Sequence, residues 1–103
     1  MISEALSRED LRLDGDELVL VDFYSDDCVF CERLAPVLED VSFELPFVTI
    51  IKINCSRVAG ISEEFDVFAF PTLKLYRAGE ELDSATGFRP ADALKTFIAA
   101  QLY

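Results

Sequence analysis

The chain has 103 residues, 51% of them hydrophobic, which suffices for one domain with an apolar core, residues 1–103, and leaves no room for a second. Twenty acidic and nine basic residues give a formal net charge of −11, which argues against binding nucleic acid or anionic lipid through a basic patch. No apolar run of about eighteen residues predicts a membrane span, and Met1–Glu4 lacks the features of a secretory leader. We therefore expect a cytosolic protein or a domain separated from a longer precursor.

The first part of the chain predicts two strands with a short helix between them. Ile2–Ala5 is expected to form an edge strand, and a capping-box pattern at Ser7–Asp10 begins a helix that ends near Arg12. The apolar run Leu18–Tyr24 has the length of a strand covered on both faces of a sheet. Within this run Asp22 is the exception. An acid kept in a buried strand at an energetic cost often does acid–base work.

An amphipathic helix is predicted after this strand. Its apolar positions recur at three- and four-residue spacing, which indicates one buried face: Phe30, Leu34, Val37, Leu38, Val41 and Leu45. Pro36 falls inside the helix, where a proline removes a hydrogen bond and kinks the axis. The chain is expected to turn near Pro46.

Two cysteines lie three residues apart where the strand gives way to this helix. Cys28 is expected at or just before the first helical turn, where free N–H groups and the helix dipole favour a thiolate. Cys31, one turn further on, shares a helix face with it and can attack a mixed disulfide formed on Cys28. The hypothesis is that Cys28 is the nucleophile and Cys31 the resolving thiol.

The cysteine pair has two other interpretations. Half of a zinc site needs two further ligands, but the chain has no histidine and one other cysteine, Cys55, so we expect no metal here without a partner chain. Two inert core cysteines are the other alternative. The position of Cys28 ahead of the apolar stripe argues against it.

The second part of the chain predicts three more strands. Phe47–Asn54 has the composition of an inner strand, interrupted by Lys52. Cys55 closes this strand and is interpreted as a small buried hydrophobe, with a regulatory thiol as the alternative. Leu73–Arg77 and Glu81–Thr86 are expected to form a hairpin.

Two more helices are predicted around this hairpin. Gly60–Asp66 suggests a short helix capped by Ser62. After Gly87 breaks the last strand, Pro90 suits the first position of a closing helix. The apolar face of that helix comprises Leu94, Phe97, Ile98 and Leu102. The alternation of strands and helices implies an α/β fold with a mixed sheet flanked by helices.

With these elements placed, the chain resembles the thioredoxin superfamily over nearly its full length. The motifs that carry the resemblance are Val21-Asp22-Phe23-Tyr24, the Cys28/Cys31 pair, Ala35-Pro36, Lys52 and Phe70-Pro71-Thr72. The resemblance implies a thioredoxin fold with about four to five strands. It also implies a cis Pro71 beside the cysteines, and a backbone at Phe70 that binds an extended substrate segment. Asp22 and Lys52 would exchange protons with Cys31, and no cofactor beyond the Cys28–Cys31 disulfide is implied.

Within the superfamily the chain is most similar to the catalytic domains of protein disulfide isomerases. Lys52–Ser56, Phe70–Arg77 and Gly87–Arg89 carry this likeness. It implies that Arg89 approaches the cysteines and adjusts their acidity, with an ordinary solvated arginine as the alternative. It further implies a monomeric thiol–disulfide oxidoreductase of the endoplasmic reticulum lumen. Its partners would be protein thiols and disulfides, and glutathione, a reductase or an oxidase. A cytosolic thioredoxin served by a reductase, and a client-binding module with poor redox activity, are the alternatives.

The chain departs from these families directly at the cysteines. Asp27 replaces the usual tryptophan on the expected substrate-binding face, and Val29-Phe30 replaces the usual dipeptide between the cysteines. The Asp26 and Asp27 carboxylates disfavour a nearby thiolate, or one of them caps the helix and competes for its N–H groups. Both routes predict a Cys28 that is less acidic than is usual for the family.

Overall fold

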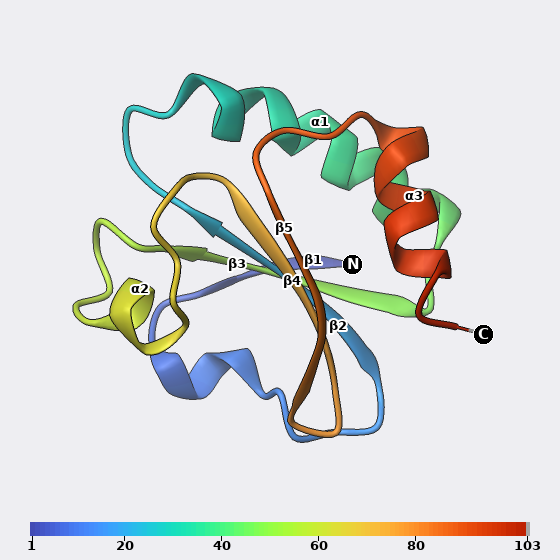
Figure 1. Ribbon diagram of the computed structural model, residues 1–103, viewed down its shortest axis with the longest axis horizontal. Coiled ribbons are helices and arrows are strands. Elements are labelled where there is room, and N and C mark those ends of the chain that lie inside the picture. Colours follow the sequence, from blue (N-terminus) through green and yellow to red (C-terminus); the bar gives the residue numbers. More distant parts are fainter. Residues whose placement is uncertain (103) are drawn as a thin grey trace.

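The computed structural model describes residues 1–102, which form a five-stranded mixed sheet between two layers of helices (Figure 1). In chain order the elements are β1 (Ile2–Ala5), the 3₁₀ helix η1 (Arg8–Leu11), β2 (Leu18–Tyr24), α1 (Val29–Glu44), β3 (Val48–Asn54), α2 (Ile61–Glu64), β4 (Thr72–Arg77), β5 (Glu80–Thr86) and α3 (Ala91–Ala99). The α/β class predicted from the sequence is confirmed.

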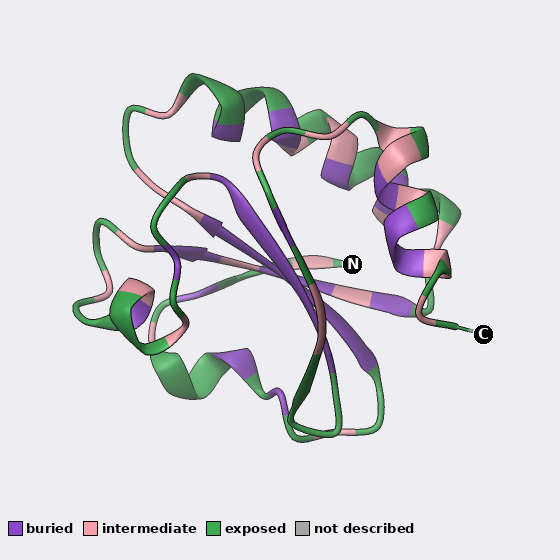
Figure 2. Cartoon of the chain, viewed as in Figure 1, coloured by how far each residue is buried: buried purple, intermediate pink, exposed green. Residues whose placement is uncertain are grey.

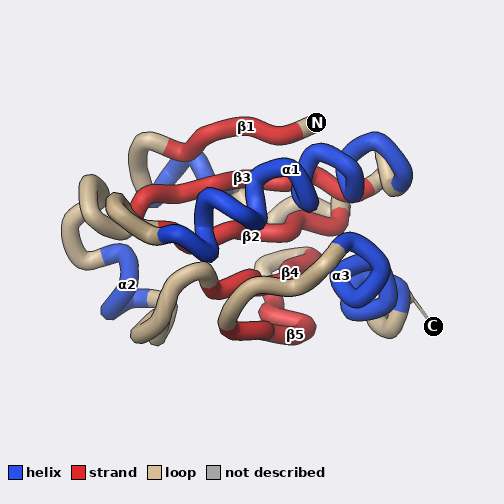
Figure 3. Tube along the Cα trace, turned by 90° about the horizontal axis from the view of Figure 1, so that it is seen from above, coloured by secondary structure: helices blue, strands red, loops and turns tan. Residues whose placement is uncertain are grey.

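The strands lie in the order β1-β3-β2-β4-β5, which Figure 3 shows from above. β1, β3 and β2 are parallel neighbours, whereas β4 runs antiparallel to both β2 and β5. The carboxyl ends of β2 and β3 therefore lie beside the beginning of β4, at one end of the strands. The site described below lies at this end of the sheet.

Two apolar clusters fill the space between sheet and helices. One packs α1 and α3 on a sheet face with residues such as Leu20, Ile50 and Leu38. The other packs η1 and the α2 region on the opposite face around Phe23 and Ile53. Because β2 contributes to both clusters, its residues are buried on both faces, as its continuous apolar run predicts (Figure 2).

Several predicted details of the helix ends are wrong. Ser62 does not cap α2, because Gly60 takes that position with a φ of 79°, a value that glycine adopts without strain. Pro90 is the N-cap of α3 and not its first residue. The side chain of Ser7 makes no capping hydrogen bond at η1.

Two residues assigned to apolar helix faces lie outside the core. Phe30 is 54% exposed in the first turn of α1, where the neighbouring Cys31 is buried instead. Leu102 lies beyond the end of α3 and is also exposed. Sequence periodicity identifies the middle of a buried helix face better than its ends, where the first and last turns extend past the sheet.

Candidate functional site

The cysteine pair lies at the start of α1 and is joined as a disulfide, with the two Cα atoms 5.2 Å apart. Cys28 is the N-cap residue, and its Sγ accepts a hydrogen bond from the backbone N–H of Cys31 at 3.2 Å. Cys28 is half-buried, whereas Cys31 is only 6% exposed. An attacking group from solvent therefore reaches Cys28 first, and Cys31 is sheltered behind it.

The segment before β4 lies beside the nucleophile. The Phe70–Pro71 peptide bond is cis, as the resemblance implied, and the carbonyl oxygen of Phe70 lies 3.8 Å from Cys28 Sγ. The hydroxyl of Thr72 donates to the carbonyl of Ala69 at 2.7 Å, which fixes the turn. The start of β4 thus places a backbone acceptor next to the reactive sulfur.

Asp22 is a fully buried carboxyl group on β2. Its side chain is 0% exposed, and neither carboxylate oxygen has a hydrogen-bond partner within residues 1–102. Burial raises the pKa of Asp22 to about 7; the charge of Lys52 lowers it and that of Glu4 raises it further. An acid with this pKa can accept and release a proton near neutral pH.

Lys52 lies beside Asp22 in the register of β3 against β2. Its Nζ is 4.8 Å from the centroid of the Tyr24 ring, a cation–π contact. Among the described residues no ion pair joins Lys52 to Asp22. The lysine acts on the carboxylate by its charge alone.

The two aspartates before Cys28 differ in their surroundings. The Asp26 carboxylate accepts a hydrogen bond from Asn54 Nδ2 at 2.9 Å and lies 3.5 Å from Arg57 Nε, and these contacts lower its pKa. Asp27 is exposed and has a φ of 53°, in the left-handed region that aspartate tolerates better than most residues. Neither carboxylate caps α1, because Cys28 fills that position itself. Of the two routes predicted for the acids, only the like-charge effect remains.

Arg89 packs on an aromatic ring, and Cys55 is a free thiol with a raised pKa. The Arg89 guanidinium carbon is 5.6 Å from the centroid of the Phe97 ring, and within residues 1–102 no hydrogen bond or ion pair joins it to Cys28 or Cys31. Cys55 is a free, half-buried thiol whose pKa burial raises to about 11. It is therefore a protonated, unreactive thiol at neutral pH.

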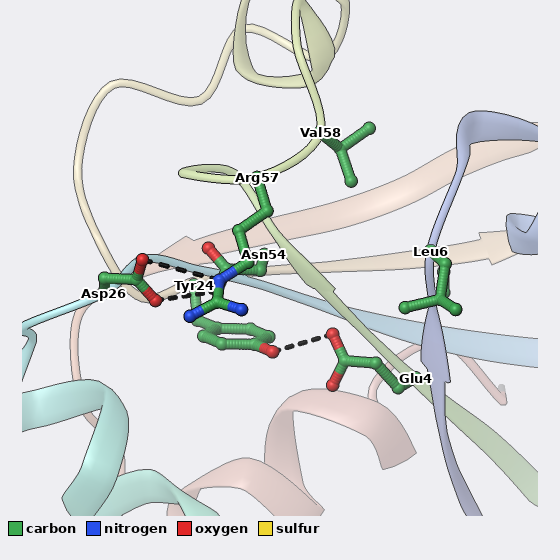
Figure 4. Close-up of a pocket in the computed structure, with 8 residues that line it drawn as sticks. Glu4, Leu6, Tyr24, Asp26, Asn54, Arg57 and Val58 are labelled. Atoms are coloured by element: carbon green, nitrogen blue, oxygen red, sulfur yellow. Dashed lines mark hydrogen bonds and ion pairs between the residues drawn. The ribbon is translucent and has the colours of Figure 1, made fainter.

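The sequence patterns assign no role to Glu4, Asn54 and Arg57, three polar residues near this site. A pocket of about 430 Å³ is lined by Glu4, Tyr24, Asp26, Asn54 and Arg57, among others. Figure 4 shows two groups of contacts in it: Tyr24 with Glu4, and Asp26 with Asn54 and Arg57. These residues come from β1, the end of β2 with its following loop, and the end of β3 with its following loop, so only the strand order brings them together.

A smaller pocket of about 290 Å³ lies at the cysteines themselves. Its lining includes Cys28, Cys31, Asp27 and Lys52. Residues 1–102 contain no cluster of three or more side chains suited to holding a metal ion. No helix among them is long and apolar enough to cross a membrane.

Comparison with known proteins adds independent information. The family model described as Thioredoxin matches residues 6–100. Thioredoxin of Chlamydia muridarum is 40% identical over 82 residues, which cover 80% of each chain. Thioredoxin-1 of Saccharomyces cerevisiae is 35% identical, covering 91% of this chain and 90% of the relative. Protein disulfide-isomerase A3 of Gallus gallus is also 35% identical, but the match spans 82% of this chain and 17% of that longer protein.

Solved structures agree with these sequence matches. The structure of Plasmodium falciparum thioredoxin superposes with a TM-score of 0.86 at 29% identity, covering 95% of this chain and 97% of the other. The fold is therefore shared along nearly the full length of both chains.

Proposed function

The chain belongs to the thioredoxin family, a family of thiol–disulfide oxidoreductases with a redox-active cysteine pair and no external cofactor, and we propose that this member is a dithiol reductant of protein disulfides. Thioredoxins match it along most of their own length, whereas the isomerase match spans a small part of a longer protein. This difference favours the thioredoxin alternative over the isomerase-like function expected from the sequence.

The chemistry proceeds in two exchanges at the start of α1. In the reduced protein the Cys28 thiolate attacks one sulfur of a substrate disulfide, whose S–S bond breaks and releases one substrate thiolate. Cys31 then loses its proton and attacks Cys28 Sγ, which forms the Cys28–Cys31 disulfide and releases the second substrate thiol. Two electrons pass to the substrate. A reductase or another dithiol must return them for the next cycle.

The observation that carries this assignment is the capping geometry of Cys28. Its Sγ receives the N–H of Cys31 at 3.2 Å, so a thiolate at this position is stabilised by a helix N-terminus. The Phe70 carbonyl at 3.8 Å marks the side from which an extended substrate segment would approach. The buried Cys31 fits the resolving role.

Reduction of insulin by the dithiol form tests the function. We expect turnover with the parent protein, none with Cys28→Ser, and a trapped mixed disulfide with Cys31→Ser, because that variant keeps the nucleophile but cannot resolve the adduct. Cys55→Ala serves as the matched control and should keep near-parental turnover, since that thiol stays protonated. No insulin reduction by the parent, or alkylation of Cys31 before Cys28 at neutral pH, would contradict the assignment.

An isomerase-type role is the second candidate, supported by the 35% identity to protein disulfide-isomerase A3. Under that hypothesis Arg89 would leave Phe97 and approach the cysteines during the reaction. Arg89→Ala would then slow reoxidation of the dithiol. Equal reoxidation rates in the variant and the parent would exclude this contribution.

A further inference from the structure

Three ionisable side chains lie in one row across the sheet. The strand register pairs Glu4 of β1 with Lys52 of β3, and Lys52 with Asp22 of β2. Side chains paired in register on neighbouring parallel strands project from the same face. Lys52 therefore lies between an exposed carboxylate at the sheet edge and a buried carboxylate at its centre.

Tyr24 contacts two members of this row, Glu4 at the edge and Lys52 in the middle. The Lys52 Nζ atom lies 4.8 Å from the centroid of the Tyr24 ring. The Tyr24 hydroxyl donates to Glu4 Oε2 at 2.7 Å, a contact that Figure 4 shows. Among the described residues, Lys52 forms no ion pair with either carboxylate. The cation–π contact with the Tyr24 ring thus holds the Lys52 ammonium, which would otherwise be attracted to the carboxylate of Glu4 or Asp22.

We propose that Tyr24 and Glu4 are positioning residues for proton transfer at the cysteine pair: Glu4 fixes the Tyr24 ring, the ring holds the Lys52 ammonium, and Asp22 is thereby kept free of an ion pair. The inference rests on the redox function proposed above. When Cys31 attacks the mixed disulfide, its S–H proton passes to Asp22, the Cys28–Cys31 bond forms, and the substrate sulfur leaves with the electron pair of the broken bond. A carboxylate locked in an ion pair would be a weaker proton acceptor.

The other groups around Asp22 leave this row as its main electrostatic influence. In register on β4 its neighbour is the uncharged Leu73, and Cys55 beyond β3 holds its proton at neutral pH. α1 and the loop before it bring further groups to the pocket that contains Lys52. These groups are Asp26, Asp27, Glu32 and the Cys28–Cys31 disulfide. Lys52 lowers the pKa of Asp22 and Glu4 raises it, second and third to the effect of burial.

The test is the titration of the Asp22 carboxyl carbon by NMR in the oxidised protein, with Asp22→Asn used to assign the resonance. Glu4→Gln removes a charge two strand spacings away, about 9.5 Å, and should lower the Asp22 midpoint by roughly half to one pH unit. In the double variant Glu4→Gln/Tyr24→Leu the released ammonium has Asp22 as its partner in the row. The midpoint should therefore fall further than in Glu4→Gln alone.

Glu39→Gln is the matched control, because it makes the same charge change at an exposed position of α1 that has no ion pair among the described residues. Its Asp22 midpoint should equal that of the parent. A Glu4→Gln midpoint equal to the control, or a double variant equal to Glu4→Gln, would overturn the proposal.

A second readout links the row to the reaction. The acid limb of the pH profile for insulin reduction should move with the Asp22 midpoint in Glu4→Gln, and a limb that stays in place would also overturn the proposal. The titration needs no substrate. If the variants shift the Asp22 midpoint as predicted but the parent does not reduce insulin, the result would contradict the proposed reductant function while supporting the arrangement of the row.

Discussion

At the scale of single residues, Asp22 is the group whose environment differs most from that of its side chain in water. Burial raises its pKa from 3.8 to about 7, so between these two values the folded protein binds a proton that the unfolded chain has released. The contribution of Asp22 to stability therefore falls as the pH rises from about 4 to about 7 and is constant above that range. The native fold carries this cost at neutral pH, at the position where the proposed mechanism requires a proton acceptor.

Asp22→Asn tests this pH dependence. The variant should gain stability over the parent at pH 8, and the gain should be larger at pH 8 than at pH 5 by about 2–3 kcal/mol. Burial of the asparagine amide costs the same at both pH values, so it cancels in the comparison. Urea unfolding of the oxidised proteins measures it. A gain that does not depend on pH would mean that Asp22 is not held in its neutral form by burial.

Asp27 is the second residue with a specific expectation. Its exposed carboxylate precedes the nucleophile and disfavours a nearby thiolate. Asp27→Asn should therefore lower the Cys28 pKa, and asparagine accepts the φ of 53° that a tryptophan at this position would strain. Thiolate absorbance near about 240 nm follows the titration of the reduced protein, since the thiolate is the absorbing form. An unchanged or higher Cys28 pKa in the variant would mean that the Asp27 carboxylate does not disfavour the Cys28 thiolate.

At the scale of elements, α1 depends on a few buried side chains at its centre. Leu38 is 0% exposed in the cluster between α1 and the sheet, so Leu38→Ala should cost about 2–5 kcal/mol of unfolding free energy. Phe43→Ala is the control on the same helix, because that ring is 87% exposed and its loss should change stability by less than about 0.5 kcal/mol. Urea unfolding measures both variants. Equal losses of unfolding free energy in the two would mean that α1 packs on the sheet through a different face.

The sequence predicts the elements better than it predicts their ends. The run Leu18–Tyr24 and the spacing from Leu34 to Val41 are long, regular patterns, and both elements form where expected. The N-cap of α2 was missed because a glycine at positive φ provides it, although Ser62 has the better capping side chain. The path of the loop before α2 therefore outweighs the capping propensity of the individual side chains.

Only part of the candidate site can likewise be predicted from the sequence. The Cys28–Cys31 spacing and the isolated Asp22 are visible in the sequence because each breaks a local pattern. The row of Glu4, Lys52 and Asp22 is not, because it depends on which strands are neighbours and on their register. Tyr24 looks like the end of an apolar strand until its hydroxyl is found on Glu4. Tertiary register created these contacts, and no local pattern encodes it.

At the scale of the whole molecule, the strand order explains why the chemistry gathers at one edge. β2 and β3 end there, β4 begins there, and α1 starts directly after β2. Cys28 thus lies at a helix N-terminus near the start of β4, and the buried Asp22 lies two residues before the end of β2. The redox site is formed where the ends of β2 and β3 lie next to the starts of β4 and α1. Its direction depends on how stable the Cys28–Cys31 disulfide is.

The reduction potential of the Cys28–Cys31 pair, measured by equilibration with dithiol and glutathione buffers, tests the proposed reductant most directly. A Cys28 thiolate disfavoured by the neighbouring Asp27 makes the dithiol form less stable relative to the disulfide, so the pair should be reducing. We predict a potential near that of thioredoxin, about −270 mV. A value near about −180 mV, that of protein disulfide isomerase, would contradict the reductant and favour the isomerase-type role.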